Sequence, residues 1–374
     1  MMPKKEILFI IENLRGGGAE KVLLDLLRRF DYSLYHVSLL IAYPDGVYKN
    51  DIPKEVELIS LYKRNHTFCR KAFRYYKRYN GFSFLLKYQL RKRINGSYDI
   101  VISFLEGRAL LLHSLIKDKG AVNITWVHCD LSTYHWTAAA FPNLSAEKRC
   151  YSGMDKIVFV SYQAMANFSK VFDLSVPVTC IYNIIDTEYI KVLAEKEEVS
   201  YSCFTVTSIG TLNRVKAFDK LLYVAKRFSN AEYPIRFQII GEGDYERQLK
   251  KLCNELGVQN MVSFLGFKDN PYPYLKKSDV YVSTSLSEGF SLAIGEAMGL
   301  GVPVVATRTA GSVELLDDGR CGILTEHDDE AVYRGIKLLV DDEKLRRKYA
   351  EKATARSGNF AVDKVMQQIY QLFD

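Results

Sequence analysis

Strand-like apolar runs alternate with helix-length amphipathic stretches along nearly all of the 374-residue chain. A strongly periodic run at 19–30 is typical of a helix, with Val22, Leu23, Leu26 and Leu27 at helical spacing. Alternating strands and helices predict an α/β fold with parallel sheets covered by helices on both faces. Twelve strands are expected, at 6–11, 36–42, 100–104, 124–128, 156–161, 178–182, 203–209, 235–240, 262–265, 280–283, 303–306 and 322–325.

The alternation falls into two series of similar size, separated by the polar stretch 194–200, which we interpret as a linker. A chain of this length exceeds what one hydrophobic core usually serves. The sequence therefore predicts two Rossmann-like domains, at 1–188 and 200–359, with a ligand cleft between them at the carboxyl ends of the strands.

Composition narrows the class of protein. Hydrophobic residues make up 48% and charged residues 25% of the chain, as in ordinary globular enzymes. The seven cysteines include no CxxC pair, which favours reduced thiols in a cytosol. The apolar run at 7–11 is too short for a signal peptide, and no run of eighteen apolar residues predicts a membrane span. We expect a cytoplasmic protein, free or resting on a membrane surface.

The strongest chemical signal is a glycine-containing turn between the strand at 280–283 and a helix that begins near Ser291. Backbone amides at a helix start form an anion site, Ser291 is placed to cap the helix, and Gly289 lets an anion approach the backbone. Glu296, on the second turn, could accept hydrogen bonds from ribose hydroxyls, and Glu288 stands at the turn itself. Two such glutamates alone would suggest a capped surface helix, but the turn after a strand favours the anion site.

This segment, Glu288 to Glu296 with Phe290 and Leu292 inside it, resembles the E-x7-E signature of the retaining glycosyltransferases of family GT4. The runs at 301–306, 310–316, 318–319 and 322–324 match the family in order and spacing. The resemblance implies a GT-B fold, in which two Rossmann-like domains face each other across a cleft. It implies a nucleotide-sugar donor on the second domain, with diphosphate on the amides of 289–292, and a last helix, 360–374, that returns to the first domain.

A second stretch, Gly210 to Asp219, is similar to the family's G-R-L-x-x-x-K-G-x-D. Lys216 falls on the family lysine, which neutralises the donor diphosphate. Thr211 stands where the family has arginine, and Ala217 where it has glycine. Arg214 either supplies the missing charge from a neighbouring position or is a solvated loop residue.

Weaker matches complete the donor site. Gly241 and Gly243 resemble the family's G-x-G turn, and the run 264–267, which ends at Phe267, resembles the family segment whose backbone reads the nucleobase. In the first half, Gly16 and Gly17 resemble the family loop beside the phosphates and the acceptor. This interpretation of the two glycines as part of a ligand-binding loop is compatible with a tight strand-to-helix turn at the same place.

His128, at the end of a strand, resembles the family histidine that faces the transferred sugar, and we assign it with Glu288 to the catalytic centre. A lone histidine at a strand end is otherwise more often structural. Together with Cys129, Asp130 and His135 it could suggest zinc, but this spacing fits no standard ligand pattern. The sequence has no D-x-D, which metal-dependent transferases of the other major fold use. We therefore expect no metal and no cofactor.

Residues 62–95 form a basic, aromatic segment without any Asp or Glu, and residues 1–190 carry a net charge of +8 against −1 for the remainder. Basic residues with interleaved aromatic ones are typical of helices at membrane interfaces. No RNA-binding motif accompanies the segment, so nucleic acid is not an expected partner. A plain solvated helix would mix charges of both signs. We predict contact with an anionic membrane surface or a lipid-linked acceptor, through Arg70, Lys71, Arg74, Lys77, Arg78, Arg91, Lys92 and Arg93.

The resemblance implies a metal-independent hexosyltransferase that moves a sugar to a glycan or lipid-linked acceptor with retained configuration. It favours a UDP-sugar over a GDP-sugar as the donor. By analogy the process is assembly of a bacterial surface polysaccharide or glycolipid on the inner face of the cytoplasmic membrane. The alternatives are a nucleotide-sugar epimerase or glycosyl phosphorylase of the same fold, and a degenerate, non-catalytic sugar-nucleotide-binding protein, which Thr211 and Ala217 leave open.

Overall fold

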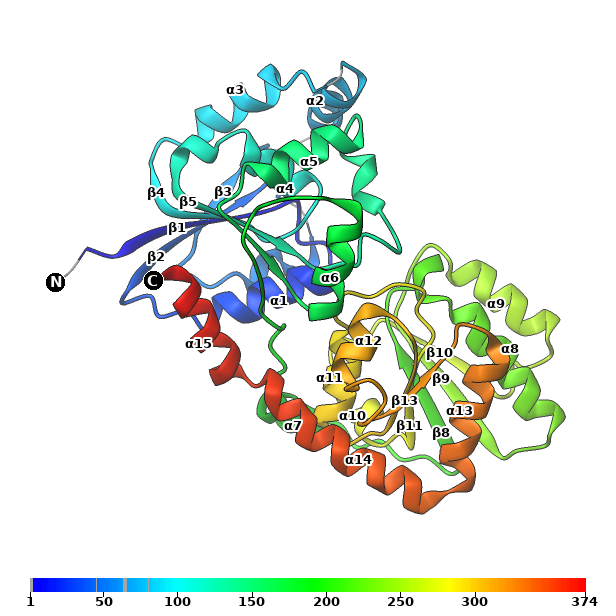
Figure 1. Ribbon diagram of the computed structural model, residues 1–374. Coiled ribbons are helices and arrows are strands. Elements are labelled where there is room, and N and C mark those ends of the chain that lie inside the picture. The colour runs from blue at the N-terminus through cyan, green and yellow to red at the C-terminus, as the bar shows by residue number, and fades with distance from the viewer. Residues whose placement is uncertain (1–2, 45, 63–65, 80) are drawn as a thin grey trace. The chain divides into compact units, whose positions relative to one another are not determined.

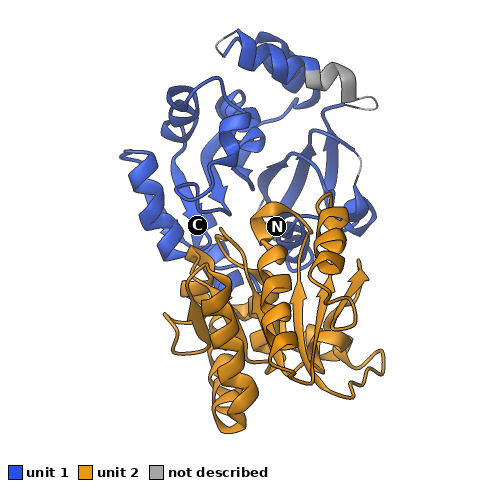
Figure 2. Ribbon diagram, turned by 90° about the vertical axis from the view of Figure 1, so that its right-hand side faces the viewer, with its two compact units in different colours: residues 1–184, 365–374 blue, residues 185–364 orange. Residues whose placement is uncertain are grey.

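The computed structural model describes residues 3–44, 46–62, 66–79 and 81–374, with no side-chain description for 66–70. It divides into two compact units (Figure 2). Unit 1 consists of residues 1–184 and 365–374, and unit 2 of residues 185–364. Each unit is built around one parallel sheet with helices on both faces (Figure 1), so the predicted α/β class is confirmed.

Unit 1 has a seven-stranded sheet in the order β3-β2-β1-β4-β5-β6-β7, and every neighbouring pair is parallel. Its strands are β1 (Lys5–Ile11), β2 (Tyr35–Ile41), β3 (Glu57–Ser60), β4 (Tyr98–Ser103), β5 (Gly120–Val127), β6 (Lys156–Phe159) and β7 (Val178–Cys180). Its helices are α1 (Gly18–Leu27), α2 (His66–Arg78), α3 (Phe84–Arg93), α4 (Arg108–Ser114), α5 (Leu144–Ser152), α6 (Tyr162–Val171) and α15 (Val362–Phe373), with 3-10 turns η1 (Val47–Asp51), η2 (Lys117–Lys119) and η3 (Trp136–Ala139).

The central strand β1 shows why unit 1 needs helices on both faces. Its residues from Ile7 to Ile11 are all fully buried, as expected for a strand covered on each side. Leu8 and Ile10 belong to the core that α2 to α6 cover. On the other face, the Phe9 ring packs edge-on against Phe30, with ring centroids 5.8 Å apart.

Unit 2 has a six-stranded parallel sheet in the order β10-β9-β8-β11-β12-β13. Its strands are β8 (Phe204–Ile209), β9 (Ile235–Ile240), β10 (Val262–Gly266), β11 (Val280–Ser283), β12 (Val304–Thr307) and β13 (Ile323–Thr325). Its helices are α7 (Thr187–Ala194), α8 (Phe218–Asn230), α9 (Glu246–Glu255), α10 (Tyr272–Lys276), α11 (Leu292–Gly299), α12 (Ala310–Leu315), α13 (Asp329–Asp341) and α14 (Glu343–Ser357), with 3-10 turns η4 (Arg214–Lys216) and η5 (Gly358–Phe360).

The division between the units falls at Ile184 and Ile185, and not at the polar stretch 194–200 that we interpreted as the linker. The reason is α7, which packs against α10 and α11 of unit 2. A Cβ added to Gly299 would lie only 2.9 Å from Oγ1 of Thr187 and 3.4 Å from Cδ1 of Ile190. This close helix packing ties the polar stretch to unit 2.

The C-terminal helix α15 is divided between the two units. Residues 362–364 belong to unit 2, and the residues from Val365 onward belong to unit 1. The ring of Tyr370 stacks on Tyr35 with centroids 5.7 Å apart and planes 1° from parallel. Phe373 packs against Phe30 at 6.0 Å. The end of the chain thus completes the core that α1 covers.

Candidate active site

The sheet order of unit 2 places a switch point between β8 and β11, since the chain continues from β8 to β9 on one side and builds β11 to β13 on the other. Open α/β sheets bind ligands at the carboxyl ends of their strands at such a point. Backbone hydrogen bonds join the loops that follow these strands. The amide of Leu212 donates to the carbonyl of Glu242 at 2.9 Å, and that of Leu286 to Val215 at 2.8 Å.

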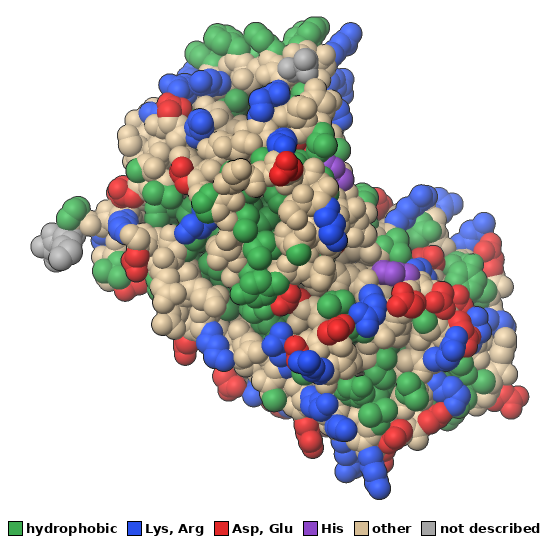
Figure 3. Space-filling model, viewed as in Figure 1, with side chains coloured by type: hydrophobic (Ala, Val, Ile, Leu, Met, Phe, Trp, Pro, Cys, Tyr) green, Lys and Arg blue, Asp and Glu red, His purple; other side chains and the backbone are tan. Residues whose placement is uncertain are grey.

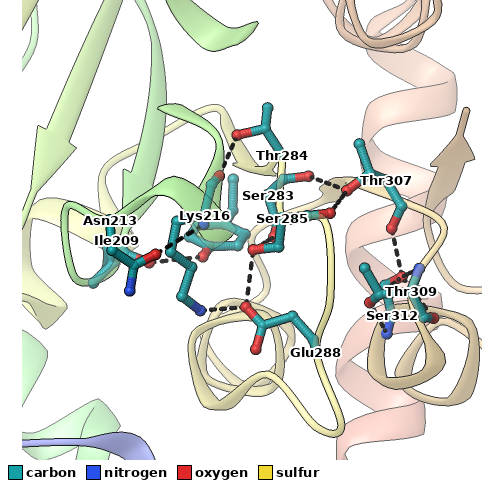
Figure 4. Close-up of polar contacts among 11 residues, drawn as sticks. Ile209, Asn213, Lys216, Ser283, Thr284, Ser285, Glu288, Thr307, Thr309 and Ser312 are labelled. Atoms are coloured by element: carbon teal, nitrogen blue, oxygen red, sulfur yellow. Dashed lines mark hydrogen bonds and ion pairs between the residues drawn. The ribbon is translucent and has the colours of Figure 1, made fainter. Parts of the chain in front are cut away.

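Lys216, which follows β8, and Glu288, which follows β11, meet at this switch point. Their side chains point toward one another and form an ion pair (Figure 4). The Lys216 amide donates to Oδ1 of Asn213 at 3.1 Å, and its carbonyl accepts from Oγ1 of Thr284 at 2.9 Å. The lysine is therefore held from two loops, with its ammonium group beside a carboxylate.

The backbone conformation of Ala217 explains why the family has glycine at this position. It adopts the left-handed conformation, with φ 48° and ψ 44°, and its side chain is buried. Glycine enters this region without steric cost, whereas an L-residue with a side chain costs roughly 1–2 kcal/mol. The departure from the family pattern therefore leaves the backbone turn at Lys216 in place.

Glu288 is held by a second contact besides the lysine. Oγ of Ser285 donates to Oε1 of Glu288 at 2.9 Å. Its own backbone carbonyl accepts from the amide of Gly311 at 2.8 Å. A Cβ on Gly311 would lie 2.8 Å from Cα of Phe290, so the turn rests directly on the start of α12.

The helix predicted to start near Ser291 is α11, and Ser291 is its N-cap residue by position. The prediction that its side chain caps the helix is wrong, because Ser291 makes no side-chain bond to the helix amides. By contrast, Thr309 caps α12 through a bond from the amide of Ser312 at 3.1 Å. The side chain of the N-cap residue thus does not occupy the amides at the start of α11, where the helix dipole favours an anion.

Glu296 lies on α11 with 7% of its surface exposed. Its Oε1 accepts a hydrogen bond from the hydroxyl of Tyr272 at 3.0 Å. The nearby hydroxyl of Tyr281 donates to the carbonyl of Ile209 at 3.3 Å. Burial, and after it the charge of Glu288, raises the pKa of Tyr281 well above its ordinary value.

Gly241 and Gly243 are positions where the loop after β9 lies against the loop after β8. A Cβ on Gly241, which has φ +140°, would lie 2.0 Å from the carbonyl oxygen of Gly210. A Cβ on Gly243 would lie 2.3 Å from that of Leu212. The sequence motif therefore has a packing reason in addition to any contact with a ligand.

Two further predicted donor residues lie at the rim of these loops. The guanidinium of Arg214 lies over the ring of Tyr245, 5.7 Å from its centroid. Phe267 is 52% exposed, and its amide donates to Oε1 of Glu242 at 3.3 Å. The replacement of the family arginine by Arg214 stays a prediction.

In unit 1, the glycine turn after β1 is closed by the carboxylate of Glu20. Its Oε2 accepts from the amides of Gly16 at 2.6 Å and Gly17 at 3.0 Å. Burial raises the pKa of Glu20, against the lowering effect of these two donors. The amides at this turn are thus engaged by the protein itself, which is the tight-turn interpretation of the motif.

His128 follows β5 and packs on Phe104, with ring centroids 4.9 Å apart. Within the described residues, neither ring nitrogen makes a hydrogen bond with good geometry. Burial lowers the pKa of His128 to about 3, and the backbone of Phe104 opposes this only in part. His128 is therefore a neutral imidazole at physiological pH.

Glu106 lies beneath His128 and was not predicted. Its buried carboxylate accepts from the backbone amide of His128 at 2.9 Å and from Nε1 of Trp136 at 3.3 Å. Burial raises its pKa, with the amide of His128 as the main opposing influence. Its place just after the strand predicted at 100–104 was the available signal, because strand ends carry functional side chains in this fold class.

The basic segment forms two helices, α2 and α3, with Ala72, Phe73 and Tyr76 buried on α2 and Leu86 and Leu90 on α3. Figure 3 shows basic and apolar side chains together over the part of unit 1 that carries them. Arg91 pairs with Asp118 at 2.7 Å, so this charge is partly balanced within the unit. Lys63 and Arg64 lie outside the described residues, as does the side chain of Arg70.

The described residues form neither a metal-binding cluster nor a membrane-spanning helix. No group of three or more His, Cys, Asp and Glu side chains among them could hold a metal ion. None of their helices combines the length and the apolar character that crossing a bilayer requires.

Comparison with known proteins matches each half of the chain to a family. Residues 16–189 match Glycosyltransferase Family 4, and residues 193–356 match Glycosyl transferases group 1. An N-acetylgalactosamine-N,N'-diacetylbacillosaminyl-diphospho-undecaprenol 4-alpha-N-acetylgalactosaminyltransferase of Campylobacter jejuni is 32% identical over 219 residues, 58% of each chain. The lipopolysaccharide core biosynthesis glycosyltransferase LpsE of Rhizobium meliloti is 31% identical over 45% of this chain and 48% of its own. These matches thus span about half the length of either relative.

The same fold occurs in HepE of Anabaena, solved in complex with UDP and glucose. That structure has a TM-score of 0.77 and 22% identity, and the match covers 98% of this chain and 99% of the other. Two parallel-sheet units with this topology are the GT-B architecture. The chain therefore belongs to the group 1, family 4 glycosyltransferases.

Proposed function

We propose that this protein transfers a sugar from a UDP-sugar to a hydroxyl of a glycan or lipid-linked acceptor, with retained configuration and without a divalent ion. The observation that carries the proposal is the switch point of unit 2. There the uncapped start of α11 follows a turn whose Glu288 is paired with Lys216. A helix start and an ammonium group together neutralise a diphosphate.

The roles of the side chains follow from their positions. The ribose is expected on Glu296, which Tyr272 orients. The diphosphate is expected on the amides of residues 289–292 and on Lys216, whose ammonium group has three donors and can serve Glu288 and a phosphate together. Gly210, Gly241 and Gly243 would bring their backbones against the nucleotide.

The chemistry would then depend on positioning and charge. The departing phosphate oxygen would take the proton of the acceptor hydroxyl on the face from which it leaves, with His128 and Gly17 on the acceptor side. Preorganised donors stabilise the charge that develops on that oxygen. A neutral imidazole at His128 would donate or accept one hydrogen bond to the transferred sugar without adding charge.

The comparisons support the choice of substrates. HepE was solved with UDP and glucose, and the Campylobacter relative is named for a diphospho-undecaprenol acceptor and an alpha linkage. An α-linked product formed from an α-linked nucleotide sugar requires retention. The Rhizobium relative acts in lipopolysaccharide core biosynthesis, which supports a role in bacterial surface glycan assembly.

The test is UDP and GDP release from a panel of nucleotide sugars by the full chain, with and without a membrane extract as acceptor, in buffer containing EDTA. We expect UDP release that depends on acceptor and persists in EDTA, an α-anomeric product by proton NMR, and loss of turnover in Glu296→Gln. Sugar inversion at a ring carbon without nucleotide release would identify an epimerase instead. Nucleotide binding without turnover on any acceptor would identify a non-catalytic protein.

We further propose that unit 1 rests on the inner face of the cytoplasmic membrane through α2 and α3. Exposed rings of Tyr75, Tyr79, Phe84 and Tyr88 accompany their basic residues. Each basic residue near an anionic leaflet contributes about 1 kcal/mol. Co-sedimentation with vesicles containing phosphatidylglycerol, lost at high salt, is the expected result. Equal binding to neutral vesicles would contradict an electrostatic contact.

A further inference from the structure

The described part of unit 1 contains a cavity of about 620 Å³, within the size range of ligand sites. Its charged lining consists of five basic side chains and one carboxylate, which are Arg15, Arg74, Lys77, Arg78, Arg108 and Glu12. Such an excess of one charge in a concave site raises the local concentration of ions of opposite charge. The feature is distinct from the donor residues of unit 2.

The position of the cavity in the fold also points to a ligand. Glu12 directly follows β1, and Arg108 is the first residue of α4, after β4. These two strands are neighbours at the middle of the sheet, where the strand order reverses. The cavity therefore lies at the carboxyl edge of unit 1, at its own switch point, where this class of sheet binds ligands.

The inner part of the lining is held in a defined geometry. Nη1 of Arg108 donates to Oε1 of Glu12 at 2.5 Å, and its guanidinium lies 4.9 Å from the centroid of Phe73. The guanidinium of Arg15 lies 5.7 Å from the centroid of Tyr43. Planar contacts of this kind fix the orientation of a guanidinium fork before a ligand binds.

The outer part of the lining comes from α2. Nζ of Lys77 donates to the carbonyl of Ala139 at 3.3 Å, and Arg78 lies over the ring of Tyr79. Among the described residues, the ion pairs of this region are those of Arg91 and Arg108, and no carboxylate pairs with Arg74, Lys77 or Arg78. These three charges are therefore left for solvent or for an anionic ligand to compensate.

We propose that this cavity binds the diphosphate of a lipid diphosphate that carries the acceptor glycan. The inference rests on the proposed glycosyltransferase function. Guanidinium forks match pairs of phosphate oxygens, and several of them select a diphosphate over a single carboxylate. The exposed aromatic side chains of Tyr75 on α2 and of Tyr79, which follows the helix, would contact the lipid chain.

The first test measures binding of farnesyl diphosphate to the full chain by calorimetry. The variant Arg74→Gln/Arg108→Gln removes two cavity charges, and Lys54→Gln/Lys87→Gln removes two exposed charges of unit 1 outside the lining. We expect the cavity variant to raise the Kd at least about 10-fold, because each charged hydrogen bond is strong, and the control to leave it within about twofold. Equal effects of the two variants would overturn the proposal.

Two additional measurements separate the sources of the effect. Arg74→Gln alone, which leaves the pair of Arg108 and Glu12 intact, is expected to weaken farnesyl diphosphate binding by several-fold, while UDP binding stays unchanged. Loss of UDP affinity as well would overturn the proposal, because the variant then acts on the donor site or on folding. The last measurement is binding of the two double variants to vesicles of 30% phosphatidylglycerol. If both variants lose vesicle binding to a similar extent while farnesyl diphosphate binding stays unchanged, the charges serve a lipid surface and the proposal is wrong.

Failure of the proposed function is recognisable by itself. If no nucleotide sugar binds or turns over but the cavity variant still loses farnesyl diphosphate, the site stands and the reaction does not. If turnover is found, the cavity variant is expected to raise the KM for a lipid diphosphate acceptor and leave the KM for the donor unchanged. A normal acceptor KM in that variant would refute the cavity assignment while keeping the transferase.

Discussion

Two basic residues close together in the chain, Lys216 and Arg214, have different surroundings in unit 2. Lys216 forms an ion pair with Glu288 across two loops, whereas the guanidinium of Arg214 lies over Tyr245. We expect Lys216→Gln to raise the Kd for UDP roughly 10- to 100-fold, from the loss of a charged hydrogen bond. Isothermal titration of UDP, without metal, is the measurement.

Arg214→Gln is the matched control, with the same loss of charge two residues away. We expect a change below about threefold, because the ring of Tyr245 holds the guanidinium. A loss as large as that of Lys216→Gln would show instead that Arg214 replaces the family arginine missing at Thr211.

His128 allows function and stability to be separated at one residue. Neither of its ring nitrogens has a well-formed hydrogen bond in the described structure, and its pKa is about 3 against an ordinary 6.5. His128→Phe keeps the aromatic contact with Phe104 and leaves no partner unsatisfied. We expect it to abolish turnover while the free energy of unfolding at pH 7 stays equal or rises.

The pH dependence of that variant follows from the sign of the shift. A group with a lowered pKa in the folded state stabilises the protein above its unfolded pKa, and the contribution is lost as the pH falls below about 6.5. The free energy of unfolding of the wild type should therefore fall by roughly 2 kcal/mol more between pH 7 and pH 5 than that of His128→Phe. Urea unfolding at both pH values measures the difference. Glu106, whose pKa is raised, is present in both proteins, so its contribution to the pH dependence cancels in the comparison. If wild type and His128→Phe lose the same unfolding free energy between pH 7 and pH 5, His128 is not a buried neutral histidine.

At the scale of elements, the donor site depends on close approach of the loops after β8 and β9. In Gly243→Ala the new Cβ would meet the backbone oxygen of Leu212 at 2.3 Å, and backbone cannot rotate away as a side chain can. We expect a loss of about 1–3 kcal/mol in stability and weaker UDP binding. Thermal unfolding and UDP titration are the measurements.

Gly358→Ala in the same unit is the control for this substitution. Nothing lies within 4 Å of a Cβ there, and the backbone is right-handed at φ −60° and ψ −13°. Alanine at such a site is neutral or stabilises by roughly 0.4–1 kcal/mol through the unfolded chain. Equal losses in both variants would show that the loop contact has no special role.

The elements themselves were largely predictable, and their exceptions have physical reasons. Strands such as β9 and β11 have the predicted bounds because each is a short run of mostly buried, mostly apolar residues. The edge strand β3 (Glu57–Ser60) was missed, because its residues are only partly buried and give no continuous apolar run. Ser291 was placed correctly at a helix start, but its lack of a side-chain bond depends on the fold of the turn.

At the scale of the whole molecule, the last ten residues complete the core of the unit with which the chain begins. Tyr370 and Phe373 pack against Phe30 and Tyr35, and Nζ of Lys5 donates to the carbonyl of Phe373 at 2.7 Å. We expect Phe373→Ala to destabilise unit 1 by about 3–5 kcal/mol. Calorimetry should show a lower transition temperature for this unit.

Tyr223→Ala, at a residue 43% exposed on α8, is the control and should change stability by less than about 0.5 kcal/mol. A chain ending at residue 361 should behave as Phe373→Ala or worse. Unchanged unfolding of such a chain would mean that the C-terminal helix is not part of the core of unit 1.

The sequence by itself determined the α/β class, the two halves, the family and the residues at 210–219 and 288–296, because periodicity and short motifs are local properties of the chain. Only the tertiary structure decided which distant residues meet. It paired Lys216 with Glu288, placed Glu106 beneath His128, and gathered Arg15, Arg74 and Arg108 around one cavity. Those contacts depend on strand order and helix packing, and strand order in a parallel sheet cannot be read from the order of the strands in the chain.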